Sequence, residues 1–188
     1  MIQWKKKRSI MKRYDATASI YDTRYAEEQA AKYEAAFEGL EHESLGLVLD
    51  VGCGTGLLFA SIADNAEAIA GLDISREILL VARKRRQIHN NVHLILADAD
   101  NMPLRDGIFD HVFAMTVIQN SPNPARTLEE IKNSAKDSAE IVVTGLKKVF
   151  SKERFKKLVE YAGFRIISLK DEEDNLRCYV AVCTKLQH

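Results

Sequence analysis

Short, nearly continuous apolar runs alternate along this chain with longer segments in which apolar residues recur every three or four positions. The runs are typical of strands covered on both faces of a parallel sheet, and the periodic segments are typical of helices packed on it. Five strands are predicted in succession, at residues 47–51, 68–73, 92–97, 109–117 and 140–146. Helices are predicted at residues 25–40, 56–65, 75–87 and 124–135. This alternation predicts an α/β fold in three α/β/α layers with right-handed crossovers.

The pattern changes after residue 150. Ser151 can cap a helix with an apolar stripe, and Gly163 suits the position just past the end of that helix. Two strand-like runs follow, at 164–169 and 176–184, and the polar turn DEEDN joins them. The mostly parallel sheet is therefore expected to finish with an antiparallel C-terminal hairpin.

The composition fits one compact domain. The 188 residues are 46% apolar, which suffices for a continuous core. The 27 basic and 27 acidic residues cancel, so no overall field favours nucleic acid or an anionic membrane. Before Asp15, however, the chain carries basic side chains and no acid, which makes this segment a basic arm. Its basic residues are Lys5, Lys6, Lys7, Arg8, Lys12 and Arg13.

Cysteine usage and hydropathy indicate a soluble, cytoplasmic protein. Cys53, Cys178 and Cys183 are odd in number and lack the spacing of a zinc site or a disulfide framework, so we expect buried thiols and no metal site. No stretch approaches the roughly 20 apolar residues that span a bilayer, and the basic start lacks the apolar run of a signal peptide. No membrane association is expected.

The most specific motif follows the first predicted strand. Asp50 precedes Gly52, Gly54 and Gly56, and a helical pattern begins at once. A loop that holds a ligand against its main chain, and a helix that packs closely on its strand, both need residues without a Cβ. In an open parallel sheet the ligand lies beyond the carboxyl ends of the strands, where this loop falls. The structural alternative is a tight turn without a ligand.

Three acids at successive strand ends indicate which ligand this is. The spacing G-x-G-x-G differs from the dinucleotide fingerprint, and Asp50 would repel a pyrophosphate but attract an ammonium group and a sulfonium centre. Asp73 ends the second strand and can accept hydrogen bonds from both ribose hydroxyls. Asp98 ends the third strand and could accept one from an adenine amine. Each of the last two could instead cap a helix or lie in a solvated turn.

With these residues the sequence resembles a class I methyltransferase of the seven-stranded Rossmann-like type, which uses S-adenosyl-L-methionine. The resemblance extends from residue 47 to residue 184 and includes the hairpin. It implies that the glycine loop holds the methionine part of the cofactor, that the second strand end holds the ribose and that the third holds the adenine. The residues that it assigns to the cofactor are Asp50, Gly52, Cys53, Gly54, Gly56, Asp73, Ile74, Asp98, Ala99 and Thr116, with Tyr14, Tyr21 and Tyr25.

Those tyrosines belong to a lead-in, residues 14–22, that resembles the Y-D-x-x-A-x-x-Y-D stretch preceding the core of many such enzymes and continues to Tyr25. The resemblance implies that the lead-in folds over the cofactor, with tyrosines that bind its carboxylate or face the substrate. We therefore expect residues 1–46 to be a basic, helical segment that covers the cofactor site of a core at 47–188. The alternative is an amphipathic helix whose tyrosines fill the core.

The loop at 116–122 is where the resemblance places the methyl acceptor. Gln119 and Asn120 are suited to orienting a polar substrate, with Tyr14 and Tyr21 as further candidates, although the first two could instead cap the helix after Pro124. No catalytic residue is assigned, since in-line displacement can rest on alignment alone. The loop has neither the Asn/Asp-Pro-Pro-aromatic run of base-amine methyltransferases nor a cysteine nucleophile. His111 is expected to be a satisfied core or surface residue.

These observations predict an S-adenosylmethionine-dependent methyltransferase that acts on a small or medium-sized polar acceptor. RNA, either tRNA or rRNA, is the second acceptor class, because basic residues recur at 83–86, 147–148, 152 and 156–157. A non-catalytic cofactor-binding or partner subunit is another alternative, and a nicotinamide oxidoreductase is opposed by Asp50 and the hairpin. Because no domain is inserted before the Ser151 helix, a protein partner or a second copy could roof the pocket.

Overall fold

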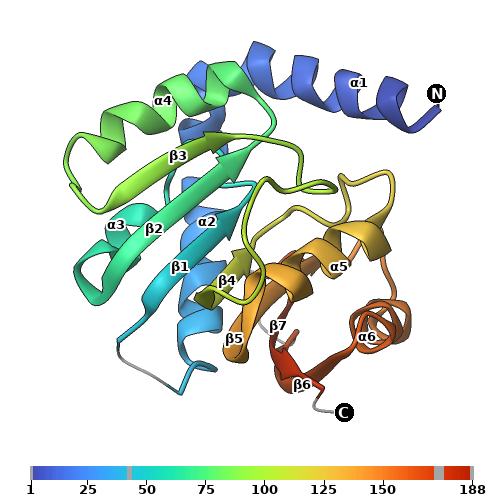
Figure 1. Ribbon diagram of the computed structural model, residues 1–188. Helices are drawn as coiled ribbons and strands as arrows, with labels where there is room; N and C mark the ends of the chain where they lie inside the picture. Colours follow the sequence, from blue (N-terminus) through green and yellow to red (C-terminus); the bar gives the residue numbers. More distant parts are fainter. Residues whose placement is uncertain (1, 42–43, 172–175, 187–188) are drawn as a thin grey trace.

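Seven strands form one sheet in the computed structural model, which describes residues 2–41, 44–171 and 176–186 (Figure 1). The strands are β1 (Gly46–Val51), β2 (Ala66–Asp73), β3 (Val92–Leu96), β4 (Phe109–Ala114), β5 (Ala135–Leu146), β6 (Phe164–Lys170) and β7 (Cys178–Lys185). Their order across the sheet is β3-β2-β1-β4-β5-β7-β6. The first five are parallel, whereas β7 is antiparallel to both β5 and β6. The predicted parallel sheet with its antiparallel ending is confirmed.

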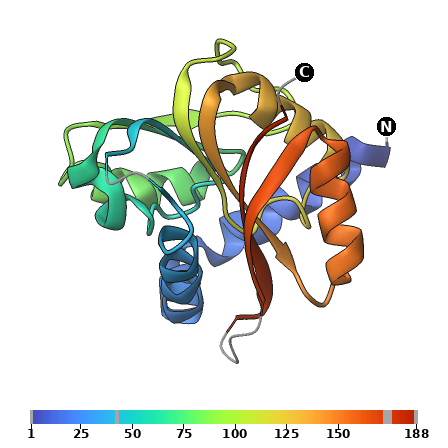
Figure 2. The ribbon, with the colours of Figure 1, turned by 90° about the horizontal axis from the view of Figure 1, so that it is seen from below.

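Helices cover both faces of the sheet. They are α1 (Ile2–Thr17), α2 (Tyr21–Phe37), α3 (Phe59–Ile62), α4 (Arg76–Arg86), α5 (Pro124–Ser134) and α6 (Lys152–Tyr161), with 3-10 turns at Ala18–Ile20 and Ala63–Asn65. One apolar core joins residues of α2, α3 and α4 to the sheet, and a second joins residues of α5 and α6 to the opposite face. Figure 2 shows α2 and α6 on opposite sides of the strands. The three predicted layers are therefore present.

Predicted caps define several helix ends. The Ser75 hydroxyl accepts a hydrogen bond from the Ile78 amide at 3.2 Å at the start of α4, and Ser151 does the same for α6 from the Arg154 amide at 3.3 Å. Gly163 takes a φ of +90° just after α6, a conformation that glycine adopts without strain. These local signals are confirmed because each depends on contacts within one turn.

Several element boundaries differ from the sequence pattern, and the helix predicted at 25–40 is α2, Tyr21–Phe37. The fourth strand ends at Ala114, because Thr116 takes a φ of +65° and turns the chain, although Met115 and Ile118 in that turn are buried. The helix predicted at 56–65 begins only at Phe59, because Gly56 takes a φ of +77°. The fifth strand begins at Ala135, where a helix end was predicted. Residues 172–175, which are all of the turn DEEDN except Asp171, lie outside the described residues.

Within the described part of the chain, no helix combines the length and the apolar character needed to cross a membrane. All three cysteines are buried free thiols. Burial raises the pKa of Cys178 to about 11 and that of Cys183 to about 12. Their thiols therefore stay protonated near neutral pH, as expected for structural residues.

Candidate functional site

The site lies at the carboxyl ends of the parallel strands, where the chain order reverses. From β1 the chain proceeds to β2 on one side, whereas β4 pairs with β1 on the other. Crevices at such a reversal are the usual ligand sites of open α/β sheets. Helix α1 runs past this edge, on the side toward which the arrowheads of β1 and β2 point (Figure 1). The sheet and α1 together therefore enclose the crevice.

Three adjoining pockets occupy this crevice. The strand-end pocket is lined by Lys7, Ile10, Tyr14, Gly52, Gly54, Leu72, Asp73, Ile74, Ile78, Asp98, Ala99, Asp100, Met115, Thr116, Val117, Asn120, Ser121 and Pro122. The glycine-loop pocket is lined by Gln29, Tyr33, Asp50, Gly52, Cys53, Gly54, Thr55, Leu57 and Met115. The basic pocket is lined by Arg13, Tyr14, Thr17, Tyr25, Glu28, Gln29, Lys32, Thr116, Gln119, Asn120, Leu146, Lys147, Lys148, Val149 and Arg177. Gly52 and Gly54 border the first two pockets, and Thr116 borders the first and third.

The glycine loop has the backbone conformation that its sequence requires. Gly52 takes a φ of +68°, and a Cβ there would lie 2.6 Å from a methyl carbon of Val117. Gly56 borders none of the three pockets, and a Cβ on it would lie 2.4 Å from the Phe59 ring. Gly52 thus leaves room beside the ligand pocket, whereas Gly56 lets the following helix pack closely.

Asp50 holds a buried carboxyl group at the bottom of the glycine-loop pocket. Its side chain is nearly inaccessible, and Oδ2 has no hydrogen-bond partner among the described residues. Burial, reinforced by the charge of Asp73, raises the pKa of Asp50 to about 8. A buried charge without a partner is unfavourable, and a cation placed against it recovers that energy. This carboxyl group is therefore suited to a positively charged ligand group.

Asp73 ties the loop to the end of β2. Its Oδ2 accepts a hydrogen bond from the Gly54 amide at 3.0 Å, and its Oδ1 accepts one from the Ser75 amide at 2.8 Å. Burial raises the pKa of Asp73 despite these bonds. The Ile74 amide adds a third backbone contact. A carboxylate has about four acceptor positions, so acceptor capacity remains for a ligand in the strand-end pocket.

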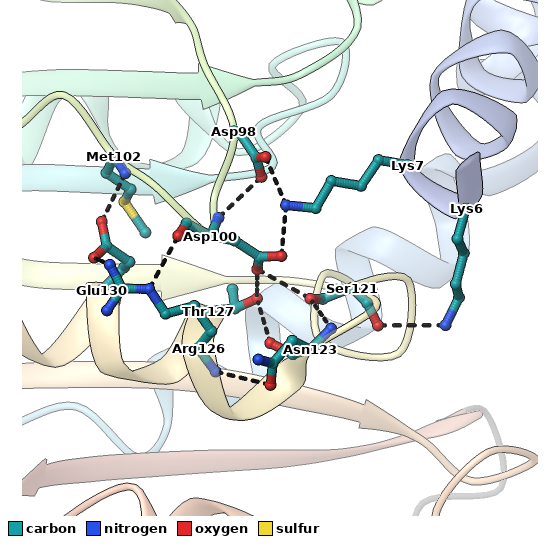
Figure 3. Close-up of polar contacts among 10 residues, drawn as sticks. All are labelled: Lys6, Lys7, Asp98, Asp100, Met102, Ser121, Asn123, Arg126, Thr127 and Glu130. Carbon is teal, nitrogen blue, oxygen red and sulfur yellow. Dashed lines mark hydrogen bonds and ion pairs between the residues drawn. The ribbon is translucent and has the colours of Figure 1, made fainter. Parts of the chain in front are cut away.

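Asp98, in contrast, is ion-paired within the chain (Figure 3). Lys7 of α1 places Nζ 2.6 Å from Oδ2 of Asp98 and 2.6 Å from Oδ2 of Asp100. Burial of this amine alone would lower its pKa, but the bonds to Asp100 and Asp98 outweigh that effect and raise the pKa of Lys7. Helix α1 is thereby fixed over the strand end where the sequence predicts the adenine.

Asp100 extends this contact to the acceptor loop. Its carboxylate accepts hydrogen bonds from Ser121 Oγ at 3.0 Å and from the Thr127 hydroxyl, and its carbonyl oxygen accepts one from Arg126 at 3.2 Å (Figure 3). Lys6 adds a longer contact to the Ser121 carbonyl at 3.5 Å. The loop after β3, the loop after β4 and the start of α5 are therefore held in one network.

The lead-in is attached to the core by its aspartates. Asp15 accepts a hydrogen bond from Ser75 Oγ at 2.5 Å, and Asp22 accepts one from Thr55 Oγ1 at 2.6 Å. Arg85 bonds Asp22 at 2.8 Å and also the Thr55 carbonyl oxygen at 2.8 Å. Sequence reasoning concentrated on the tyrosines of this motif and did not assign these two acids, although they are part of the same pattern.

The tyrosines are placed as follows. Tyr14 borders both the strand-end and the basic pocket, and its hydroxyl accepts a hydrogen bond from Asn120 Nδ2 at 3.0 Å. Burial raises the pKa of Tyr14, so the phenol stays protonated. Tyr25 borders the basic pocket and is partly exposed. Neither tyrosine fills the core. The side chain of Tyr21 lies outside the described residues.

Residues of the acceptor loop do not cap α5. The cap is Asn123, whose Oδ1 accepts a hydrogen bond from the Arg126 amide at 3.3 Å, so the predicted capping alternative for Gln119 and Asn120 is wrong. Asn120 instead donates to the Thr116 carbonyl oxygen at 2.8 Å. Gln119 borders the basic pocket, where its buried Oε1 has no hydrogen-bond partner among the described residues.

Thr116 lies where the strand-end and basic pockets meet. Its amide donates to Thr144 Oγ1 at 2.7 Å, and its hydroxyl accepts from Lys32 Nζ at 3.0 Å. A β-branched residue rarely takes a positive φ, and such strain concentrates at functional sites. Lys32 itself is 1% exposed and pairs with Glu28 at 2.7 Å. The i,i+4 spacing of that pair was readable from the sequence, but it is typical of exposed helix faces and gave no sign of burial.

His111 is a core residue, as predicted. Nδ1 lies 2.8 Å from the Leu45 carbonyl oxygen, and Nε2 lies 3.2 Å from Glu140 Oε2. The side chain is buried and borders none of the three pockets. Its contacts explain its presence within β4 without a role in chemistry.

Comparisons with known proteins agree with this geometry. A match to the methyltransferase domain family covers residues 49–143. The chain is 32% identical over 142 residues to the malonyl-[acyl-carrier protein] O-methyltransferase of Marinomonas sp. strain MWYL1, which covers 74% of this chain and 52% of that protein. It is 33% identical over 116 residues to an 18S rRNA (guanine-N(7))-methyltransferase of Schizosaccharomyces pombe, covering 60% and 42% of the two chains. The chain thus spans about half the length of the curated relatives it matches.

The fold comparison gives a fuller overlap. A solved complex between the Haloferax volcanii Trm112 methyltransferase activator and a methyltransferase contains a chain that superposes with a TM-score of 0.81. The overlap covers 93% of this chain and 96% of that one at 18% identity, so it shows a shared fold. The chain belongs to the methyltransferase domain family and has its class I, seven-stranded fold. S-adenosylmethionine is the cofactor of that family.

Proposed function

We propose that this protein transfers a methyl group from S-adenosylmethionine to a small or medium-sized polar acceptor. The observation that supports this most is the buried carboxyl group of Asp50, whose Oδ2 has no partner among the described residues. An amino-acid ammonium group is the ligand chemistry that fits it, and the sulfonium is a second cation. The proposed cofactor residues are Asp50, Gly52, Cys53, Gly54, Asp73, Ile74, Asp98, Ala99, Thr116, Tyr14, Tyr21 and Tyr25, with Gly56 supporting the loop from behind.

In this proposal the cofactor and the methyl acceptor bind in different pockets. Asp50 would hold the ammonium group, Asp73 the ribose hydroxyls and Asp98 the adenine amine. The cofactor, when bound, supplies a methyl group on an electrophilic sulfur. Residues of this chain orient the acceptor from the basic pocket toward Thr116, with Asn120, Gln119 and Tyr14 as positioning groups. Alignment of nucleophile and methyl group in a closed site supplies much of the rate enhancement.

Helix α1 and the start of α2 are part of this proposal. Residues 1–46 act as a cover on the core at 47–188, since Lys7, Asp15 and Asp22 each bond residues at the edge of the site. The cover limits access of water to the strand-end pocket. Tyr14 of this segment also borders both the strand-end pocket and the basic pocket.

A binding measurement tests the cofactor assignment. Titration of the protein with S-adenosylhomocysteine in a calorimeter should show one site, and Asp50→Asn should weaken it strongly. Asp64→Asn, an exposed acid outside the site, is the matched control and should bind like the wild type. Absence of binding to the wild type would refute both the enzyme and the cofactor-binding subunit. Binding without methyl transfer to any fraction of a cell extract would favour the subunit.

RNA is the second candidate acceptor, because one relative is named as an rRNA methyltransferase and the basic arm carries exposed lysines. The arm is not wholly available, since Lys7 is ion-paired and Arg13 donates to Asn120 at 3.1 Å. Tritium from labelled cofactor should therefore enter the small-molecule fraction of an extract. Label that is lost on ribonuclease digestion would select RNA instead.

A protein partner is a further part of the proposal. The Haloferax volcanii relative was solved in complex with an activator. In this chain β3 lies at the edge of the sheet, and Leu96 on that strand is 57% exposed. Edge strands with exposed apolar residues can pair with another chain. Size-exclusion chromatography with light scattering distinguishes a monomer from a homodimer, and co-purification tests a different partner.

A further inference from the structure

The basic pocket has an unusual charge balance. Among the described residues, five cationic side chains and one carboxylate line it, and they come from four separate parts of the chain. The cations are Arg13, Lys32, Lys147, Lys148 and Arg177, and the carboxylate is Glu28. The whole chain has a formal net charge of zero, so this positive excess is a local arrangement. Like charges gathered around a cavity are unfavourable unless an anion joins them.

Glu28, the one acid among the described residues that line the pocket, already takes part in ion pairs. Glu28 Oε1 lies 2.7 Å from the buried Lys32 amine, and its Oε2 lies 3.8 Å from the Arg177 guanidinium. Lys32 is therefore neutralised inside the pocket wall. Arg177 is 79% exposed and shares the same carboxylate at a longer distance. Glu28 thus offsets only one of the five positive charges.

Other contacts orient the remaining cations without cancelling their charge. Lys147 donates to the carbonyl oxygen of Asp171 at 2.6 Å, which satisfies a hydrogen bond but adds no negative charge. Arg13 donates to the neutral amide of Asn120. Lys148 is exposed at the rim. The outer part of the pocket therefore presents fixed positive charge to whatever enters.

Resting on the proposed function, we propose that the methyl acceptor is an anionic small molecule. Its carboxylate or phosphate group is bound by Lys147, Lys148 and Arg177, and the atom that receives the methyl group lies at Thr116, where the two pockets meet. The basic pocket has a volume of about 840 Å³, which lies within the roughly 300–1,000 Å³ of small-molecule sites. In the reaction the sulfur–methyl bond breaks with its electron pair passing to sulfur. A bond to the acceptor forms, and a neutral hydroxyl or amine also releases its proton to solvent.

A fractionated extract tests the acceptor class. Small molecules are separated by ion exchange into anionic, neutral and cationic pools, and each pool is incubated with the full chain and tritiated S-adenosylmethionine. Label should enter the anionic pool only. Label in the neutral pool, the cationic pool or RNA would overturn the inference while leaving methyl transfer intact. No label in any pool, together with no binding of S-adenosylhomocysteine, would overturn the proposed function itself.

The product distinguishes the two anion sources. A carboxylate-bearing acceptor that is methylated at another atom stays anionic, keeps its charge through phosphatase treatment and loses that charge only when the carboxylate is esterified chemically. A phosphate-bearing acceptor that is methylated elsewhere stays anionic and loses its charge only to a phosphatase. Either result supports an anionic acceptor.

A charge reversal tests the residues. Lys148→Glu should raise the KM for the anionic pool by about tenfold or more, with kcat and the affinity for S-adenosylhomocysteine little changed. Lys148→Arg should keep the wild-type KM. Lys157→Glu on the exposed face of α6 makes the same change of charge outside the pocket and should have no effect. Equal KM values in Lys148→Glu and Lys157→Glu would refute the assigned binding residues.

Discussion

The glycine-loop pocket and the strand-end pocket treat their acids in opposite ways. At the glycine loop, Asp50 is buried and its Oδ2 has no partner among the described residues. In the strand-end pocket, Asp98 is partly exposed and ion-paired to Lys7 of α1. Asp50 lies at the carboxyl end of β1 and Asp98 follows the carboxyl end of β3, so both acids lie at the same edge of the sheet. Both are expected to meet the same ligand.

This difference bears on two separate properties of the site, which are its affinity for the ligand and the route by which the ligand enters. The unpaired carboxyl group destabilises the empty protein, and a cationic ligand recovers that energy on binding. At Asp98 the chain supplies its own cation, so a ligand gains only the difference between its own contact and that of Lys7. We infer that the glycine-loop end sets the strength of binding and that the α1 end sets how the ligand enters.

The largest expected effect concerns the stability of the empty protein against pH. Because the pKa of Asp50 is raised to about 8, the folded protein holds a proton that the unfolded chain loses near pH 4. The free energy of unfolding should therefore fall by several kcal/mol as pH rises from about 4 to about 8, and then level off. Chemical denaturation at several pH values measures this. In Asp50→Asn the free energy of unfolding should depend much less on pH. The dependence that remains should come from Asp73, whose pKa is also raised. An identical slope in both proteins would contradict the burial argument.

The Asp50 carboxyl group that lowers the stability of the empty protein should strengthen ligand binding. Asp50→Asn should weaken S-adenosylhomocysteine binding by about 100-fold, because a buried charge-assisted contact is replaced by a neutral one. The same variant should be more stable than the wild type at pH 8 by about 2 kcal/mol, since an unpaired ionised group is removed. Calorimetric titration and denaturation on one preparation give both values. Loss of binding together with loss of stability would indicate simple misfolding instead.

Attachment of the lead-in should have an intermediate effect. Asp22→Ala removes the bonds from Thr55 and Arg85, so the free energy of unfolding should drop by about 1–3 kcal/mol. Binding of S-adenosylhomocysteine should weaken by about tenfold, because Thr55 is part of the glycine loop. Glu27→Ala, an exposed change on the same helix, is the control. If both variants bound alike, the lead-in would be shown not to support the loop.

The smallest effect is expected at Lys7. Lys7→Met keeps much of the side-chain length but removes the charge, so the ligand no longer competes with an internal ion pair for Asp98. S-adenosylhomocysteine should associate faster and bind about threefold more tightly, in line with the modest free energy of such pairs. Stopped-flow measurements give the rates, and Lys5→Met on the exposed side of α1 is the control. Slower association in Lys7→Met would place the barrier to entry elsewhere.

The part of the site at the carboxyl ends of β1 and β2 was predictable from the sequence. The glycine loop, Asp50 and Asp73 lie within or next to apolar runs, and their positions depend on local backbone rules. The ligand roles of all these residues remain predictions. Thr116 was expected within a strand at 109–117, but it takes a φ of +65° in a turn whose Met115 and Ile118 are buried.

The α1 half of the site was not predictable in the same way. Lys7 and Asp98 are separated by 91 positions, and the sequence carries no sign of their contact. Helix α1 has few apolar residues, so its pattern gave no stripe, and only the resemblance indicated a helical cover. Lys32 gave the opposite difficulty, because a lysine paired at i,i+4 indicates a surface, whereas here the packing of α2 against the sheet buries it.

Strand β7 has a consequence for the synthesis of the chain. It lies between β5 and β6, and it is the one strand among the described residues with which β6 pairs. During synthesis β6 therefore leaves the ribosome before β7, the strand with which it pairs. The glycine-loop half can form its sheet early during translation, whereas the half beside the basic pocket stays open until residues 178–185 have left the exit tunnel. In this interval β5 and β6 both present unpaired edges, and such edges promote aggregation.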